Sequence, residues 1–438
     1  MWPSDEPRAS APGAAPRASG PARSRASDPA RSRASGLARS RAPGLALALS
    51  LAALAACAPR TPVPVIVAPP PPVEKPVEVK PEEVHRIAIL VPLTGSNAPV
   101  GISLANAATL ALADTGRQGI RLSTYDTAAI GAAGAARRAL DDGAQLILGP
   151  LLAADAAAAR AAADARGVTI LSFSNDASIA GGRLYVLGFQ PAQSVSRVVD
   201  FASSRGMKRF AALVPDGIYG QRTSVAFTRA VAANNGQVVA LTNFARTPAA
   251  LGPAARRVTN HDRRVKQAAT ASPDGAVGPA PIAFEALLVA DSGAIAAAFS
   301  PHLARFGAPV GSYLLMGTEL WSNEPALARS AALKGAIFAA VPDQRFRSMA
   351  TRYRARFGGT PSRLASLSYD AMLLAASVAG AQWRPGQPFP QAVLADPQGF
   401  AGIDGIFRFQ GNIAERGLEV QQVTPGGFTT VSPAPKAF

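Results

Sequence analysis

Residues 86–96 read Arg-Ile-Ala-Ile-Leu-Val-Pro-Leu-Thr-Gly-Ser, and they decide the fold. The first six form a short apolar run with β-branched residues, which is typical of a buried strand, and the proline and glycine that follow end it as a turn. Residues 101–114 then place apolar side chains at helical spacing: Ile102, Leu104, Ala108, Leu110 and Leu112. A strand, a turn and a helix in this order predict the first unit of a parallel α/β sheet.

The same alternation continues along the chain. Strands are expected at residues 122–125, 145–149 and 168–173, with helices at 132–140 and 153–165 between them. After a break at 188–191 the pattern restarts, with helices at 195–204, 220–234 and 294–306 and strands at 209–214, 238–244, 284–290 and 313–316. The polar residues 245–281 are expected to form a helix and a surface loop. Strands that are apolar on both faces indicate sheets covered by helices on both sides.

The two sets of alternating strands and helices, before and after the break at 188–191, predict an α/β fold of two lobes. Each lobe is expected to be a doubly wound parallel sheet, and hinge crossovers and a central cleft lie between the lobes. Lobe 1 is expected at about 85–191 and 343–405, and lobe 2 at about 192–342 and 406–438. The chain should cross between lobes near 189–193, 341–344 and 403–406. Ligands of open α/β sheets bind beyond the carboxyl ends of the strands, so the cleft is the expected binding site.

The N-terminal part predicts export. Cys57, the only cysteine, follows an apolar run at residues 45–56, and arginines precede that run. This is the pattern of a bacterial export signal, and the run is shorter than the roughly 20 residues that a membrane-spanning helix needs. Residues 54–57, Leu-Ala-Ala-Cys, resemble the lipobox of bacterial lipoproteins, which implies that Cys57 is acylated and anchors the chain to a membrane. A chance buried cysteine is the alternative.

Two segments flank this signal. Residues 1–56 combine an Arg/Ser-rich repeat, expected to be disordered, with the signal peptide; we hypothesise that translation starts near Leu37. Residues 57–83 hold the lipidated cysteine and a proline-rich linker that favours polyproline II. At about 3.1 Å per residue the linker could reach roughly 80 Å. Residues 84–438 are expected to form the folded domain.

The charge and the missing motifs exclude several functions. The formal charge is +16, but eight arginines and three acids precede Cys57, which leaves 36 basic and 25 acidic residues after the signal. Those residues are not clustered with aromatic ones, so no nucleic-acid partner is predicted. His85, His261 and His302 lack metal-ligand spacing, and no metal or other cofactor is expected. No hydrolase or phosphate-loop motif is present, so no catalytic residue is assigned and the chain is predicted not to be an enzyme.

Short segments in a fixed order carry a family resemblance. They are Ile87–Gly95, Leu148–Leu152, Val168–Ser174, Asp216–Gly220, Gly317–Glu319, Ser368–Ala371 and Gly402–Phe409. Together, over about residues 85–431, they resemble type I periplasmic binding proteins of the leucine/isoleucine/valine-binding branch. The chain is also similar to the penicillin-binding-protein activators, outer-membrane lipoproteins that switch on peptidoglycan synthases, although a proline-rich stalk stands where the best-known of these carry a helical-repeat domain.

The resemblance to the amino-acid-binding branch implies a set of ligand contacts. Glu319 would accept the ligand's α-ammonium group, and Tyr219 would form a wall and donate a hydrogen bond. The loop with Ser172, Ser174 and Asn175 would bind the α-carboxylate. The remaining residues assigned to the cleft are Thr94, Ala153 and Trp321.

Ala153 departs from the family pattern, because amino-acid binders usually place a serine there. The lost hydrogen bond to a charged group costs about 1.5–3 kcal/mol unless another donor replaces it. The other positions also have structural interpretations. Glu319 could begin a helix, Tyr219 could pack in a turn, the serines and Thr94 could cap helices, and Trp321 could fill the core.

Two functions follow from the resemblance. The chain could be a lipoprotein on the inner leaflet of the outer membrane that reaches across the periplasm and activates a peptidoglycan synthase; Ala58 after Cys57, the stalk and Ala153 favour this hypothesis. Alternatively, it could deliver a small amino-acid-like ligand to the permease of an ABC importer, which Glu319 and Tyr219 favour. Domain closure around the ligand would then be the mechanism.

Overall fold

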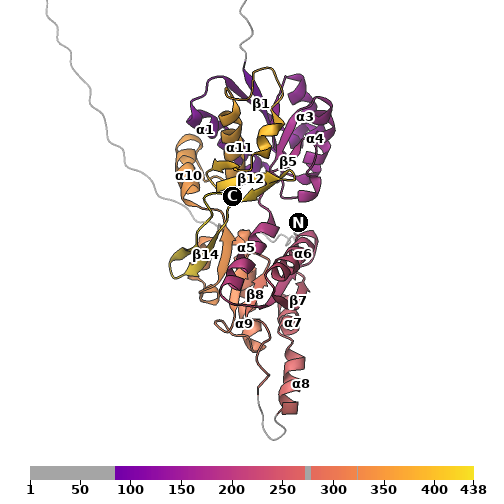
Figure 1. The fold of residues 1–438 in the computed structure, drawn as a ribbon, viewed down its shortest axis with the longest axis vertical. Coiled ribbons are helices and arrows are strands. Elements are labelled where there is room, and N and C mark those ends of the chain that lie inside the picture. Colours follow the sequence, from indigo (N-terminus) through magenta and orange to yellow (C-terminus); the bar gives the residue numbers. More distant parts are fainter. Residues whose placement is uncertain (1–83, 272–277, 323) are drawn as a thin grey trace, which may run out of the picture. The chain divides into compact units, whose positions relative to one another are not determined.

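The computed structural model describes residues 84–271, 278–322 and 324–438 (Figure 1). The predicted export signal, Cys57 and the proline-rich linker lie outside the described residues, and they stay predictions. In the part of the chain that the structure describes, no helix is both long enough and apolar enough to cross a membrane.

The first sheet has the strand order β11-β12-β13-β5-β4-β3-β1-β2. Its parallel part consists of β1 (His85–Val91), β2 (Ile120–Asp126), β3 (Leu146–Leu148), β4 (Thr169–Ser172) and β5 (Leu184–Val186). The chain returns late to add β13 (Ile413–Arg416) parallel to β5, and then β12 (Gly405–Gln410) and β11 (Phe400–Gly402) in antiparallel pairing. The parallel sheet is therefore as predicted, and the antiparallel edge is an addition to it.

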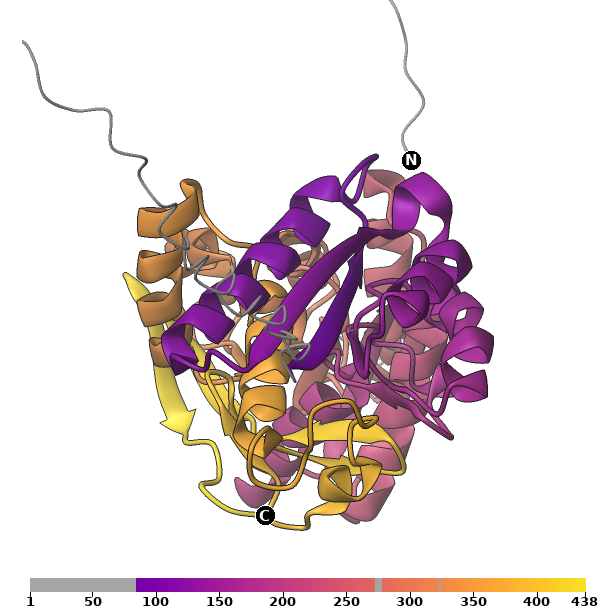
Figure 2. The same cartoon turned by 90° about the horizontal axis from the view of Figure 1, so that it is seen from above.

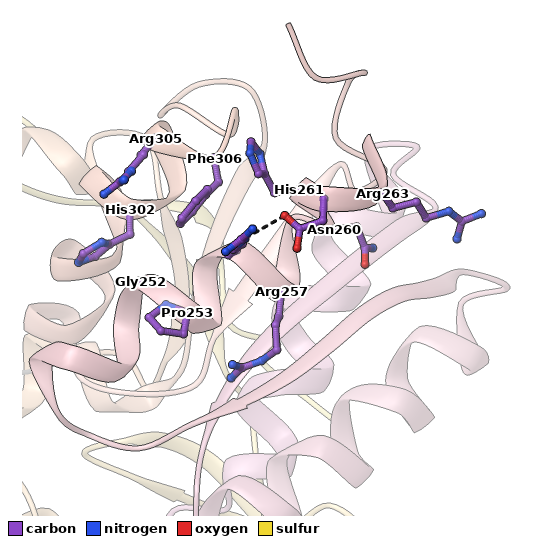
Figure 3. A pocket seen from close by; sticks show the side chains of 11 residues that line it. Gly252, Pro253, Arg257, Asn260, His261, Arg263, His302, Arg305 and Phe306 are labelled. Atoms are coloured by element: carbon purple, nitrogen blue, oxygen red, sulfur yellow. Dashed lines mark hydrogen bonds and ion pairs between the residues drawn. The ribbon is translucent and has the colours of Figure 1, made fainter. Parts of the chain in front are cut away.

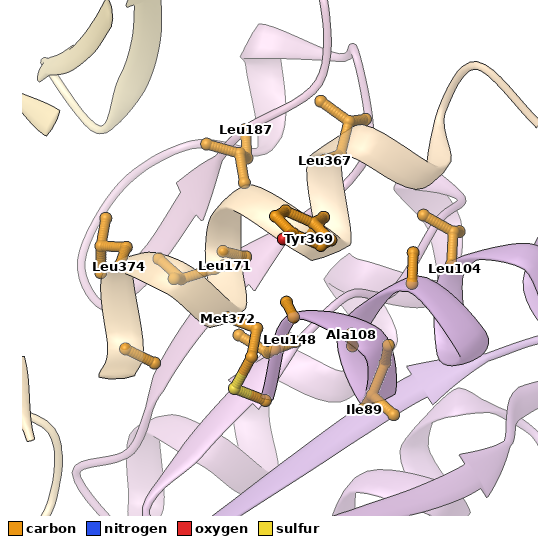
Figure 4. Packing of buried hydrophobic residues seen from close by; sticks show 14 of the residues in the cluster. Ile89, Leu104, Ala108, Leu148, Leu171, Leu187, Leu367, Tyr369, Met372 and Leu374 are labelled. Carbon is orange, nitrogen blue, oxygen red and sulfur yellow. The ribbon is translucent and has the colours of Figure 1, made fainter. Parts of the chain in front are cut away.

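Helices cover both faces of this sheet because successive strand residues point to opposite sides. On one face α1 (Ala98–Thr115), α10 (Gln344–Phe357) and α11 (Ala365–Val378) enclose Ile89 and Leu148 (Figure 4). On the other face α3 (Ala132–Asp141) and α4 (Ala153–Ala165) enclose Ala88 and Leu90. Figure 2 shows the indigo strands between α1 and the magenta helices. The short elements are α2 (Thr127–Ile130) and the 3₁₀ turns Ala177–Ile179 and Gln391–Ala395.

The second sheet has the order β15-β14-β10-β9-β8-β6-β7. Its parallel strands are β6 (Arg209–Pro215), β7 (Gln237–Phe244), β8 (Ala286–Val289), β9 (Leu314–Gly317) and β10 (Ile337–Ala340), and its antiparallel edge is β14 (Glu419–Thr424) and β15 (Gly427–Ser432). The packing helices are α5 (Pro191–Ser204) and α6 (Ile218–Ala233) on one face and α7 (Pro248–Val258) and α9 (Gly293–Arg305) on the other, and α8 (His261–Ala271) follows α7. Three 3₁₀ turns lie between β9 and β10: Glu319–Trp321, Pro325–Arg329 and Ala331–Leu333.

The two-lobed α/β fold is confirmed, and one crossing lies elsewhere than predicted. The chain passes between the sheets at residues 187–190, 341–343 and 417–418, whereas the third passage was expected at 403–406. Residues 405–416 form a hairpin of the first sheet, and Phe407 and Phe409 are buried in its core. Lobe 2 therefore resumes near residue 419. The sequence analysis also did not predict β5 or the second helix within 245–281, which is α8 (His261–Ala271). Three-residue strands and polar helices show little hydrophobic periodicity.

Candidate functional site

A cleft of about 480 Å³ lies between the two sheets, and both lobes line it. Lobe 1 contributes side chains that follow β1, β3 and β4, such as Val100, Leu152 and Asn175. Lobe 2 contributes Ser194 from α5 and Glu319 from the 3₁₀ turn after β9. The carboxyl ends of parallel strands in both sheets therefore open into one cavity, where this class of fold binds its ligands.

Glu319 is the carboxylate that lines this cleft. The Ser194 hydroxyl donates a short hydrogen bond to its Oε2, and the Tyr219 hydroxyl lies 3.4 Å from its Oε1 and 3.2 Å from the Thr318 hydroxyl. Burial raises the pKa of Glu319, and the two hydroxyls oppose that rise by bonding to the ionised form. Burial and the nearby Glu319 raise the pKa of Tyr219, so this phenol is a hydrogen-bond donor at neutral pH.

The turn that carries Glu319 is fixed from behind by Trp321. This indole is fully buried, packs against Phe338 at a ring distance of 6.0 Å and donates to the Asp291 carbonyl at 2.8 Å. A Cβ atom at Gly317 would lie 2.3 Å from the indole ring, so only glycine lets the strand end pass so close. With Trp321 held in the core, the turn directs Glu319 and its exposed neighbour Leu320 into the cleft.

The opposite wall is cationic. Arg363, just before α11, donates to Asp404 Oδ1 at 2.8 Å and to the Ser366 hydroxyl at 2.8 Å, and it keeps a partly exposed edge in the cleft. Arg416, at the end of β13, is almost fully buried and donates to the Leu187 carbonyl at 3.0 Å. The ring of Phe189 lies 5.0 Å from the Arg416 guanidinium and 5.6 Å from that of Arg363.

Two buried carboxylates compensate these arginines. Asp370 and Asp404 each lie 4.0 Å from Arg416 Nη1, and Asp370 accepts the backbone N–H of Ile403 at 2.7 Å. Burial, followed by the charge of Asp404, raises the pKa of Asp370 to about 7, and Arg416 opposes that rise. The guanidinium groups of Arg363 and Arg416 therefore line the cleft on the lobe that faces Glu319, and the two carboxylates lie buried behind them.

The structure brings only part of the predicted set into the cleft. Asn175 and Glu319 line it, and Tyr219 stands behind Glu319. Ser172 and Ser174 are buried and organise their own loop: the Ser172 hydroxyl donates to the Pro150 carbonyl at 3.0 Å, and the Ser174 hydroxyl accepts the Asp176 N–H at 3.0 Å.

The remaining predicted residues lie outside the cavity lining. The Thr94 hydroxyl donates to Asp126 Oδ2 at 3.0 Å, which pins the turn after β1 to the end of β2. Ala153 begins α4 directly after Leu152, which does line the cleft. Trp321 belongs to the core of lobe 2. Thr94 and Trp321 thus use their polar groups for contacts within their own lobes.

Sequence reasoning missed Ser194, Phe189, Arg363 and Arg416. Three of them lie next to a crossover or at the end of a late strand, and only the tertiary fold brings these positions together. The available signal was the predicted crossover at 189–193, since Phe189 lies within it and Ser194 follows it directly.

Comparisons with known proteins agree with this geometry. The sequence pattern of the family described as periplasmic binding protein matches residues 85–426. Among curated proteins, an uncharacterized protein of Rickettsia prowazekii is 25% identical over 186 residues, a match that spans 42% of this chain and 50% of the relative. The chain thus matches about half the length of that relative.

Solved structures share the fold at low sequence identity. A putative branched-chain amino acid ABC transporter protein from Rhodospirillum rubrum superposes with a TM-score of 0.64 at 21% identity, covering 80% of this chain and 100% of that one. LivJ from Streptococcus pneumoniae, solved with isoleucine, gives 0.52 at 18%, covering 80% and 100%. Full-length LpoA from Haemophilus influenzae gives 0.57 at 19%, covering 80% of this chain and 59% of LpoA.

Proposed function

Because the chain belongs to the periplasmic binding protein family, we propose that it is a non-enzymatic binding protein whose cleft takes a small ligand with an ammonium group. The observation that carries the proposal is Glu319, a carboxylate at the cleft wall that two hydroxyls hold in place. Burial has removed part of its hydration, and a bound ammonium group would restore a charged partner.

The rest of the cleft fits an amino-acid-like zwitterion. Arg363 and the Asn175 amide lie on the lobe that faces Glu319, and both can donate hydrogen bonds to a carboxylate. Leu151, Phe173 and other apolar residues offer a place for an apolar side chain. We propose that Arg363 supplies the interaction that Ala153 cannot make.

A thermal-shift panel tests this proposal. The full chain is heated with amino acids, short peptides and cell-wall fragments, and a ligand at 100 times its Kd should stabilise the fold by about 2.7 kcal/mol. Glu319→Gln should weaken that ligand by about ten- to a hundredfold, because it removes a charge-assisted hydrogen bond. The control Glu415→Gln, on β13 outside the cleft, should bind as the wild type does. A panel without any shift would refute a small-molecule function.

For the biological role, we propose a lipid-anchored protein of the periplasm, held through Cys57 at the outer membrane, that activates a penicillin-binding protein. The fold shared with LpoA and the alanine at position 153 support this role. The second candidate is the binding protein of an ABC importer for branched-chain or related amino acids. Glu319 and the fold shared with LivJ support that one.

Membrane fractionation separates the two roles. An activator anchored at the outer membrane should cosediment with that membrane, and Cys57→Ser should release it. A protein found only with the inner membrane favours the importer role, because a permease resides there. If the wild type and Cys57→Ser fractionate alike, the lipid anchor is refuted.

A further inference from the structure

A second recess of about 1000 Å³ lies on lobe 2, between α7, α8 and α9 (Figure 3). Four arginines line it: Arg256, Arg257, Arg263 and Arg305. His261 and His302 add two imidazoles, and Pro253 and Phe306 add apolar surface. None of these residues lines the cleft, so the recess is a separate site.

The charge of this recess is unbalanced. The three helices carry six basic side chains and a single acidic one, Asp262. Asp262 is already paired with Arg256 at 2.8 Å. Arg263 and Arg305 are exposed and form no ion pair with any residue that the structure describes. Arginines near the carboxyl ends of α7 and α9 complement the helix dipoles, but that effect does not explain why acids are so scarce around them.

A buried arginine strengthens the positive potential beneath the surface. Arg264 is 5% exposed, and its guanidinium donates to carbonyl groups: those of Ala280 at 2.6 Å, Phe306 at 2.9 Å, Thr259 at 3.3 Å and Gly307 at 3.4 Å. These bonds tie α8 to the residues that follow α9, one of which, Phe306, lines the recess. A full positive charge is thus held next to the recess with no carboxylate bonded to it.

We propose that this recess is a docking site for an acidic peptide segment of a protein partner. Arginine, unlike lysine, presents a planar fork that matches a carboxylate with two hydrogen bonds, and all four cationic groups that line the recess are arginines. Phe306 and Pro253 offer apolar contact to the rest of a peptide. A concave site among three helices suits an inserted chain segment better than the flat surface of a membrane.

The test uses the purified full chain and a fluorescein-labelled hexaglutamate peptide, with binding followed by fluorescence anisotropy. Hexaglutamine is the uncharged control peptide. The double variant Arg263→Gln/Arg305→Gln should weaken hexaglutamate binding about tenfold or more, because two charge-assisted contacts are lost. The charge-matched control Arg229→Gln/Arg384→Gln removes two exposed arginines that do not line the recess, and it should change the Kd less than about twofold.

Each other outcome overturns the proposal. Equal weakening by both double variants would show that net charge alone attracts the peptide. No hexaglutamate binding, together with binding to phosphatidylglycerol vesicles that the recess variant abolishes, would show a membrane-binding surface instead. Equal binding of hexaglutamine would exclude recognition of acidic groups. Matching thermal midpoints of the variants and the wild type establish that a loss of binding is not a loss of folding.

Discussion

Arg416→Met is the most informative perturbation of this fold. Methionine keeps most of the length of the side chain but removes the guanidinium, which lies 5.0 Å from the ring of Phe189 and 5.2 Å from the ring of Phe407. That group is 1% exposed and stands between Asp370 and Asp404, which are fully buried. The substitution therefore takes away the cation that faces Asp370, whereas Asp404 keeps its ion pair with Arg363 at 2.8 Å.

The structure sets the size of the effect. Each carboxylate lies 4.0 Å from Arg416 Nη1, and unit charges at that distance attract by about 4 kcal/mol at an effective dielectric constant of about 20, part of which desolvation offsets. Breaking a buried pair by removing one partner costs about 3–5 kcal/mol. We expect a loss in this range at about pH 8. The loss should be smaller at about pH 5, because Asp370, whose pKa is raised to about 7, is then protonated and needs no cation.

Urea unfolding at the two pH values measures this loss through the free energy of unfolding. Arg408→Met is the matched control, since Arg408 pairs with Glu415 at 2.7 Å in a partly exposed position and should cost no more than about 1 kcal/mol. A cost for Arg416→Met below that of the control, or an equal cost at both pH values, would refute the account of a buried, titrating cluster.

Two further predictions concern Asp370 in lobe 1 and Gly317 in lobe 2. The raised pKa of Asp370 means that the folded state binds the proton of this carboxyl more tightly than the unfolded state does. The contribution of Asp370 to the free energy of unfolding is therefore fully present below about pH 4 and is lost as the pH rises through about 7. Asp370→Asn should flatten that decline in a pH series of urea midpoints, and an unchanged decline would place the titration elsewhere. Gly317→Ala should destabilise the fold by about 1–3 kcal/mol, because the added Cβ would overlap the Trp321 ring. The control Gly119→Ala places its Cβ in open space and should be close to neutral in the same assay. Equal effects of the two substitutions would contradict the packing argument.

The candidate site was only partly predictable. Asn175 and Glu319 were expected at the cleft and do line it, because loops at the carboxyl ends of parallel strands are fixed by the strand order. Ser172 and Trp321 were expected there too, yet each bonds to a backbone carbonyl inside its own lobe. A single sequence does not reveal whether such a side chain bonds to a ligand in the cleft or to a backbone carbonyl of its own lobe.

The sequence by itself determined the alternation of strands and helices and hence two parallel sheets, since periods of 2 and 3.6 residues are local properties. Only the tertiary structure decided where the chain returns to the first sheet. The hairpin at 405–416 pairs with β5 across more than 200 residues, and that pairing depends on burial of Phe407 and Phe409 rather than on local pattern. The same return places Arg416 beside Asp370 and Asp404 beside Arg363, which lines the cleft. Charged residues so distant in the chain meet only when the core has formed, so their ion pairs and shifted pKa values depend on the tertiary structure.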